Sequence, residues 1–330
     1  MGVTAGEKRA AEELRKEGNA LFQRGKYAAA SERYTEAITL DPQSASLYVN
    51  RALCAKKQAA PGAWERILED AERALAREPN HMKANYLCGM ALRELGGDLG
   101  RAIRLLERAL ERAREQDDAI KDEIWRELAK ANDACWREES ARRRSEAEAL
   151  RSQLRKLAAV AAAVSSTGGL SQQESSGSED RDGAGASSGA QAGGGGTDMS
   201  ARKAEGSSSA GAQEPGSAAA GVAGSAGAAE VNWVALDRVF ERAARADTRG
   251  EVPSAFTCPL TMEVFRDPVV SKSGHTYERA ALTEHIAKVG GWDPITRIPM
   301  TLADVRPNIS MRTAVSVYLE EHGWAWHECY

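Results

Sequence analysis

The feature that most constrains this fold is a small residue that recurs at nearly equal spacing through the first third of the chain. Gly18 is followed by Ala52 34 residues later and by Gly89 after a further 37 residues. The longer second interval contains the insertion AAPGAW, at residues 59–64. Such a period is typical of stacked helical hairpins, each of which buries its apolar face only against its neighbours. We therefore expect an all-α superhelix of three hairpins over residues 8–116.

The residues around the recurrence indicate which kind of hairpin this is. Residues 16–42 place small, aromatic and helix-breaking side chains in an ordered series, which comprises Gly18, Ala30, Tyr34, Ala37 and Pro42. This series resembles the tetratricopeptide repeat. Small residues allow the two helices of a hairpin to approach closely, so that ridges of one pack into grooves of the other.

Residues 117–164 continue the helical pattern but change in character. Apolar residues recur at Ile120, Ile124 and Leu128, and the strongly charged stretch REESARRRSEAEA follows them. The pattern predicts a capping helix that runs on as an exposed helix or an antiparallel hairpin. Two alternatives stay open for this segment: pairing with a second copy of the chain in a homodimer, or one solvated helix.

Residues 165–229 are dominated by Gly, Ser, Ala and Gln. Such a composition cannot bury enough apolar surface to offset the entropy of ordering, so we predict a disordered linker. An amphipathic helix is expected next, over residues 230–250, with its apolar side chains docked onto the module that follows. Those side chains are Trp233, Leu236, Val239 and Phe240.

Charge and cysteine content exclude several functions. The formal net charge of −4 over 330 residues disfavours a nucleic-acid-binding protein. The chain lacks a long apolar run and an apolar leader, so we expect no membrane segment and a cytoplasmic or also nuclear location. The five cysteines include no C-x₂-C pair, which predicts neither a zinc site nor a disulfide framework, and no cofactor is expected. We expect these cysteines to be buried, except for an exposed Cys329.

Residues 253–330 contain two proline-bearing apolar loops on either side of a helix. The first loop reads CPLTMEVFRDPVV, a turn SGHTYER follows it, and the second loop reads DPITRIPM. This order resembles the U-box, a small α+β module with the layout of a zinc-binding RING but without zinc. The resemblance implies that hydrogen bonds and ion pairs replace the metal, and the candidates in the two turns are His275, Tyr277, Glu278, Arg279, Asp293 and Thr296. A zinc-dependent RING is disfavoured by the cysteine spacing.

The U-box resemblance also implies a surface for a ubiquitin-conjugating enzyme. By position in the motif, that surface comprises Leu260 and Met262 in the first loop, His285 in the helix, and Pro294 and Ile295 in the second loop. Arg297 would hold the conjugating enzyme and ubiquitin together in an attack-ready arrangement. The ligase would then act by positioning alone, without a nucleophile of its own.

Four polar residues fall at matching places on the first helices of the repeats: Arg15, Asn19, Asn50 and Lys83. Two cations and two amides that converge on one groove suit the carboxylates of a C-terminal aspartate. The set resembles the dicarboxylate clamp of tetratricopeptide co-chaperones, which hold the acidic tails of heat-shock chaperones. The resemblance places Phe22 and Leu87 in apolar side pockets of that groove.

Together, the repeats, the charged helical segment and the U-box resemble the CHIP family of co-chaperone ubiquitin ligases. Membership implies a ligase that binds heat-shock chaperone tails and promotes ubiquitin transfer from a conjugating enzyme to misfolded clients. The alternative is a non-catalytic adaptor, in which the repeats tether a chaperone and the C-terminal module only binds a partner or dimerises.

Overall fold

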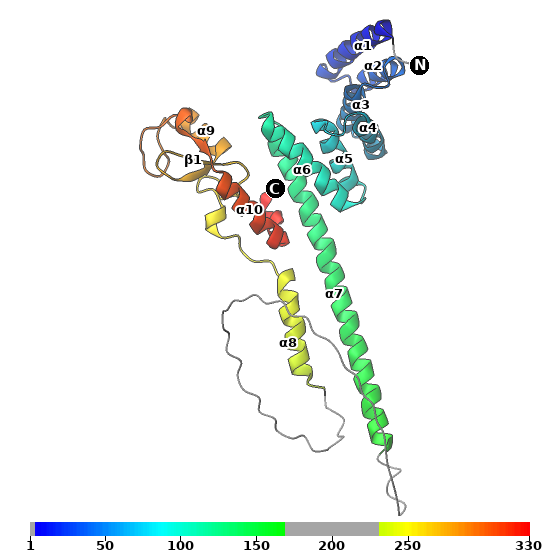
Figure 1. The fold of residues 1–330 in the computed structure, drawn as a ribbon, viewed down its shortest axis with the longest axis vertical. Helices are drawn as coiled ribbons and strands as arrows, with labels where there is room; N and C mark the ends of the chain where they lie inside the picture. Colours follow the sequence, from blue (N-terminus) through cyan, green and yellow to red (C-terminus); the bar gives the residue numbers. More distant parts are fainter. Residues whose placement is uncertain (1–3, 169–230) are drawn as a thin grey trace, which may run out of the picture. The chain divides into compact units, whose positions relative to one another are not determined.

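The computed structural model describes residues 4–168 and 231–330 (Figure 1). The predicted linker, residues 165–229, lies almost entirely outside them. Of the described residues, 4–148 and 237–330 form one compact unit, and residues 149–168 and 231–236 belong to a second. No helix in the described ranges is long and apolar enough to cross a bilayer.

The repeat region consists of three helical hairpins, as the 34-residue period predicts (Figure 1). Their helices are α1 (Ala5–Gln23), α2 (Tyr27–Leu40), α3 (Ala45–Gln58), α4 (Ala63–Arg77), α5 (Met82–Glu94) and α6 (Leu99–Glu115). Helix α1 begins at a capping box, in which Thr4 and Glu7 satisfy each other's backbone N–H groups. Residues 59–62 of the insertion form the turn between α3 and α4, where Ala59 adopts a positive φ of 48°.

Close helix contact explains the recurring small residues. A Cβ atom on Gly18 would lie 2.6 Å from the Tyr34 ring, and one on Gly89 would lie 2.7 Å from Leu106 Cγ. Ala52, at the matching place in the second repeat, is fully buried. The period in the sequence thus records where the two helices of each hairpin touch.

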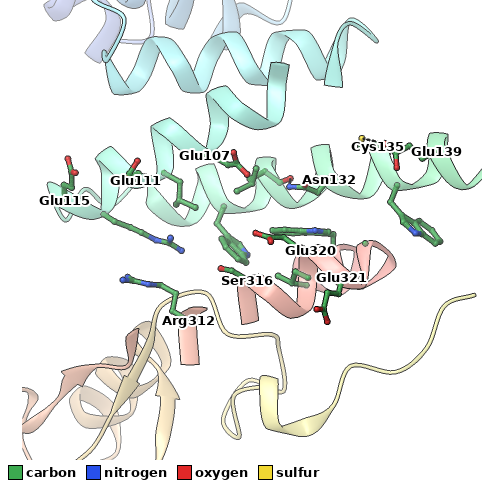
Figure 2. A pocket seen from close by; sticks show the side chains of 18 of the residues that line it. Glu107, Glu111, Glu115, Asn132, Cys135, Glu139, Arg312, Ser316, Glu320 and Glu321 are labelled. Carbon is green, nitrogen blue, oxygen red and sulfur yellow. Dashed lines mark hydrogen bonds between the residues drawn. The ribbon is translucent and has the colours of Figure 1, made fainter. Parts of the chain in front are cut away.

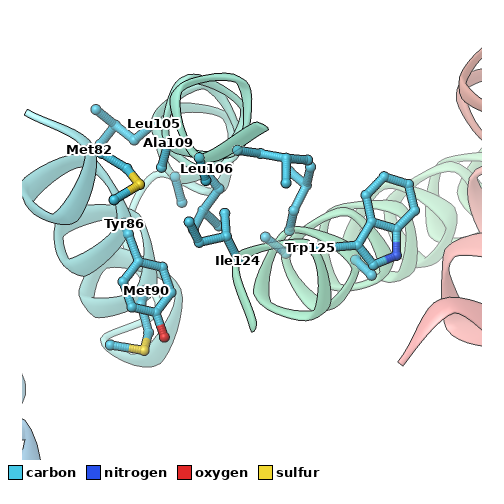
Figure 3. Close-up of a cluster of buried hydrophobic side chains, with 14 of the residues drawn as sticks. Met82, Tyr86, Met90, Leu105, Leu106, Ala109, Ile124 and Trp125 are labelled. Carbon is cyan, nitrogen blue, oxygen red and sulfur yellow. The ribbon is translucent and has the colours of Figure 1, made fainter. Parts of the chain in front are cut away.

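Helix α7 (Lys121–Gly168) follows the repeats as one continuous helix of 48 residues. Its first turns cap the third repeat: Ile124 packs among Met82 and Tyr86 of α5 and Leu106 of α6 (Figure 3). Beyond residue 148 four of its large apolar side chains are exposed: Leu150, Leu157, Val160 and Val164, with Leu157 at 65%. Between the alternatives of an extended helix and a hairpin within residues 117–164, the structure has the extended helix.

Helix α8 (Trp233–Ala244) forms where the amphipathic helix was predicted, but no residue of it is buried. Trp233 lies under the Arg155 guanidinium of α7, 6.0 Å from the ring centroid. The expectation that the apolar side chains of this helix dock onto the module that follows stays a prediction.

The C-terminal module is a small α+β fold around a three-stranded antiparallel sheet, ordered β2–β1–β3. Its strands are β1 (Pro268–Val270), β2 (Thr276–Glu278) and β3 (Arg306–Pro307). Helices α9 (Arg279–Lys288) and α10 (Ile309–Glu321) accompany the sheet, and the 3₁₀ helix η4 (Gly323–Cys329) follows α10. Val269, Tyr277, Leu282 and Leu319 form its buried centre.

Candidate functional site: two braced loops and a polar groove

The two apolar loops of the C-terminal module have the same backbone construction. In the first, the Met262 N–H donates to the Cys258 carbonyl, and in the second the Arg297 N–H donates to the Asp293 carbonyl. Met262 and Arg297 both adopt a left-handed φ of 59°. A non-glycine residue in this region costs about 1 kcal/mol, so the surrounding structure must impose it. Each loop therefore presents its side chain at a strained and sharply defined turn.

Asp293 anchors the second loop. Its carboxylate accepts hydrogen bonds from Ser271, Ser273 and Tyr277, at 2.5–2.9 Å, and from the N–H groups of Ile295 and Thr296. Burial alone would raise the pKa of the Asp293 carboxyl, but these donors outweigh it and hold the pKa well below its usual range. One buried carboxylate thus joins the strand, the turn and the second loop.

The first loop is anchored by sulfur and by a second carboxylate. Cys258 Sγ accepts the N–H groups of Leu260 and Glu278 at 3.4 and 3.2 Å. The Glu278 carboxylate accepts the N–H groups of Arg266 and Asp267. Arg279 closes the set with an ion pair of 2.7 Å to Asp267. Burial is the largest influence on Glu278 and raises the pKa of its carboxyl.

All six residues proposed as the brace in place of zinc therefore lie in these hydrogen-bonded sets. His275 joins through Ser273, with 3.3 Å between its Nδ1 and Ser273 Oγ. The sequence reading missed Ser271, Ser273 and the acceptor role of Cys258, because hydroxyls and a lone thiol carry no spacing signal. Among the described residues no cluster of His, Cys, Asp or Glu could hold a metal ion.

The predicted conjugating-enzyme residues lie on the two loops, except for His285, which lies on α9. Met262 is 74% exposed and Ile295 53%, while Leu260 is 38% exposed. Pro294 and His285 are half-buried. Arg297 is exposed and makes no side-chain hydrogen bond or ion pair with the described part of the chain. Sequence reading missed the neighbouring exposed apolar side chains of Val289, Trp292 and Ile298.

A polar groove in the repeats brings three of the four predicted clamp residues together. Arg15, Asn50 and Lys83 line one cavity of about 400 Å³. Asn19 adjoins it, because its Oδ1 accepts the Asn50 amide at 3.3 Å and the Tyr34 hydroxyl at 2.8 Å. These bonds fix the orientation of both amides. The same cavity is lined by residues that the sequence did not indicate: Ser46, Val49, Glu78, Asn80, His81, Met82, Gln116 and Asp118.

The two apolar clamp candidates differ. Phe22 is half-buried and meets Tyr27 edge-on, with ring centroids 5.1 Å apart. Leu87 is fully buried within the core of the repeats. Its predicted place in an apolar side pocket is therefore wrong, because the side chain packs into the hydrophobic interior. Arg15 is held by Glu12 through two hydrogen bonds, which raise the pKa of its guanidinium.

Comparison with known proteins supports the division of the chain into helical repeats and a C-terminal α+β module. The U-box domain family matches residues 252–324, and a TPR repeat family matches residues 18–58. Fold and site thus define a ubiquitin ligase of the U-box class that carries tetratricopeptide repeats. The E3 ubiquitin-protein ligase CHIP of Arabidopsis thaliana is 34% identical over 318 residues, covering 96% of this chain and 95% of that protein. The chain belongs to the CHIP family of E3 ubiquitin-protein ligases.

Shorter similarities occur in other proteins. WD repeat, SAM and U-box domain-containing protein 1 of Homo sapiens is 34% identical over 71 residues, 22% of this chain and 15% of that protein. Hsp70-Hsp90 organizing protein 1 of Glycine max is 40% identical over 79 residues, 24% of this chain and 13% of that protein. The TPR2B domain of yeast Sti1, solved as a complex with pHsp70, is 27% identical over 37% of this chain and 96% of that chain, with a TM-score of 0.34.

Proposed function

We propose that this ubiquitin ligase grips the acidic C-terminal tail of a heat-shock chaperone in the groove of Arg15, Asn19, Asn50 and Lys83. The observation that carries the proposal is the shared cavity of Arg15, Asn50 and Lys83, each from a different repeat. Two cations and an amide around one hollow provide charge-assisted hydrogen bonds for two carboxylates. The misfolded client held by the chaperone would then be the target of ubiquitin.

The proposed surface for the conjugating enzyme consists of Leu260, Met262, His285, Pro294 and Ile295, with Arg297 at its edge. Exposed apolar side chains on braced loops support this assignment, since such patches on a protein surface mark partner sites. Arg297 supports it further, because its guanidinium is available for a partner. In this role Arg297 restricts the freedom of the loaded conjugating enzyme and forms no covalent intermediate.

The experiment that tests the groove compares an acidic C-terminal peptide with its amidated copy by isothermal titration calorimetry. Loss of the terminal carboxylate should weaken binding about tenfold or more, since it removes charge-assisted hydrogen bonds. Equal affinity for the two peptides would overturn the groove. If the two peptides bind equally and the client is still ubiquitinated, the ligase finds its target by another mode.

We also propose that the protein forms a homodimer and that it is located in the cytoplasm and also in the nucleus. Support for the dimer comes from the exposed apolar side chains on one stretch of α7: Leu150, Leu157, Val160 and Val164. Sedimentation equilibrium of the full chain tests the dimer, and Leu157→Glu should shift it toward monomer. A monomer at all concentrations in the unmodified chain would reject it.

A further inference from the structure

The segment of residues 323–330, which follows α10, lies on the first half of α7. The Trp326 ring meets the Trp125 ring with centroids 5.6 Å apart, and both side chains are less than 10% exposed. A Cβ atom on Gly323 would lie 2.6 Å from Trp136, so the two segments are in direct contact there. Cys329, expected to be exposed, is buried, and its burial raises the pKa of its thiol to about 12.

A polar contact completes the end of this segment. The Tyr330 hydroxyl donates to Asp133 Oδ2 at 2.8 Å, and Asp133 is only 1% exposed. Arg137 forms an ion pair with the same carboxylate and donates to the Tyr330 hydroxyl at 3.2 Å. A buried carboxylate is costly without partners, so part of its compensation comes from the 323–330 segment.

Two further contacts join the C-terminal part of the chain to α6 and α7. The Arg114 guanidinium of α6 donates to the Arg266 carbonyl at 3.2 Å, and Arg143 of α7 pairs with Asp247 at 2.6 Å. Contacts thus extend from the end of α6 along about five turns of α7.

Between these contacts, α10 does not pack fully against α6 and α7. A cavity of about 1120 Å³ separates α6 and α7 from α10, with Arg312 and Ser316 of α10 on one wall and Glu107 and Glu111 of α6 on the other (Figure 2). Like charges meet there: burial and then Glu320 raise the pKa of Glu107, and burial and then Arg312 lower the pKa of Arg114. An interface with a large hollow and repelling charges is held less firmly than a domain core.

We propose that residues 323–330 are a releasable intramolecular latch that holds the U-box on helix α7. Its functional consequence rests on the proposed function: the latch fixes the span between the chaperone-tail groove and the conjugating-enzyme surface. With the latch engaged, the client lysines that can be modified lie at one fixed distance from the groove. With the latch released, ubiquitin reaches a broader set of lysines.

Amide hydrogen exchange of the full chain tests the latch directly. In Trp326→Ala, exchange over residues 125–137 should accelerate about tenfold or more, because local opening then costs less free energy. Exchange in α9 should stay unchanged if the U-box remains folded. Unchanged protection over residues 125–137 in a folded variant would overturn the latch.

A milder pair of variants decides the case in which Trp326→Ala unfolds the module. Tyr330→Phe removes only the hydroxyl that bonds Asp133, and should accelerate exchange around Asp133 by about threefold or more. Tyr318→Phe is the matched control, since it removes a U-box hydroxyl that bonds no described residue, and should change nothing on α7. Identical α7 exchange in the two variants would overturn the latch.

The functional consequence has a separate readout. Ubiquitin discharge from the conjugating enzyme onto free lysine requires only the U-box and should be equal in Trp326→Ala and the unmodified chain. The set of modified lysines on a chaperone-bound client should widen in the variant, as read by mass spectrometry. No discharge by the unmodified chain would reject the proposed conjugating-enzyme surface, while the exchange experiment would still decide the latch. An unchanged lysine set would reject the latch as a determinant of reach.

Discussion

At the scale of single residues, two side chains anchor the loops of the C-terminal module. Asp293 and Cys258 each accept backbone N–H groups at the start of a loop. A carboxylate offers more acceptor positions than a thiol, and Asp293 uses them for five donors. The second loop should therefore depend more strongly on its anchor than the first.

Asp293→Asn should destabilise the U-box by about 3 kcal/mol at neutral pH, since it weakens several hydrogen bonds to a buried charge. The effect should depend on pH. Because the folded-state pKa lies below the unfolded value of about 3.9, the Asp293 charge contributes stability above that pH and loses it as the pH falls further. Thermal unfolding of both proteins between pH 7 and pH 3 should show their difference shrinking below about pH 4. A constant difference across this range would contradict the role of the charge.

Arg297→Ala should slow ubiquitin discharge from the conjugating enzyme about tenfold or more, because a positioning cation is lost from the transition-state assembly. Arg297→Lys should recover part of the rate, since it keeps the charge but not the planar guanidinium. Arg306→Ala, an exposed cation on β3, serves as the control and should discharge at the normal rate. Full activity of Arg297→Ala would refute the assigned role.

At the scale of helices, the close contact of α1 with α2 explains why residue 18 is small. Gly18→Ala should destabilise the repeats by about 1–3 kcal/mol, because the new Cβ would overlap the Tyr34 ring. Tyr34 has little room to yield, since it is buried and its hydroxyl donates to Asn19. Urea unfolding of the full chain measures the change.

Gly6→Ala in the same helix is the matched control. Its Cβ would have only Thr4 at 4.0 Å, so the higher helix propensity of Ala should stabilise the helix by up to about 1 kcal/mol. Opposite signs for the two Gly→Ala changes would identify packing as the cause at residue 18. Stabilisation by both would show that the α1–α2 contact is loose.

At the scale of the whole molecule, target binding and transfer are assigned to different parts of the chain, so they should be separable. Lys83→Ala should weaken binding of an acidic C-terminal peptide about tenfold, because one charge-assisted contact is lost. Discharge onto free lysine should stay unchanged, while ubiquitination of a chaperone-bound client should fall. Lys57→Ala, an exposed cation of α3 outside the cavity of Arg15 and Asn50, is the control. Equal loss of both activities would refute the separation.

Local spacing along the chain predicts the three repeats, the U-box and the four polar residues of the groove. Gly18, Ala52 and Gly89 mark helix contacts, and the paired proline loops mark the U-box. Folding alone decided what depends on distant partners. Leu87 is buried by packing from other helices, and Ser271 reaches Asp293 only through the sheet. Trp326 and Tyr330 likewise contact α7 residues that are 201 and 197 positions away in the chain, and no sequence period indicates such a contact.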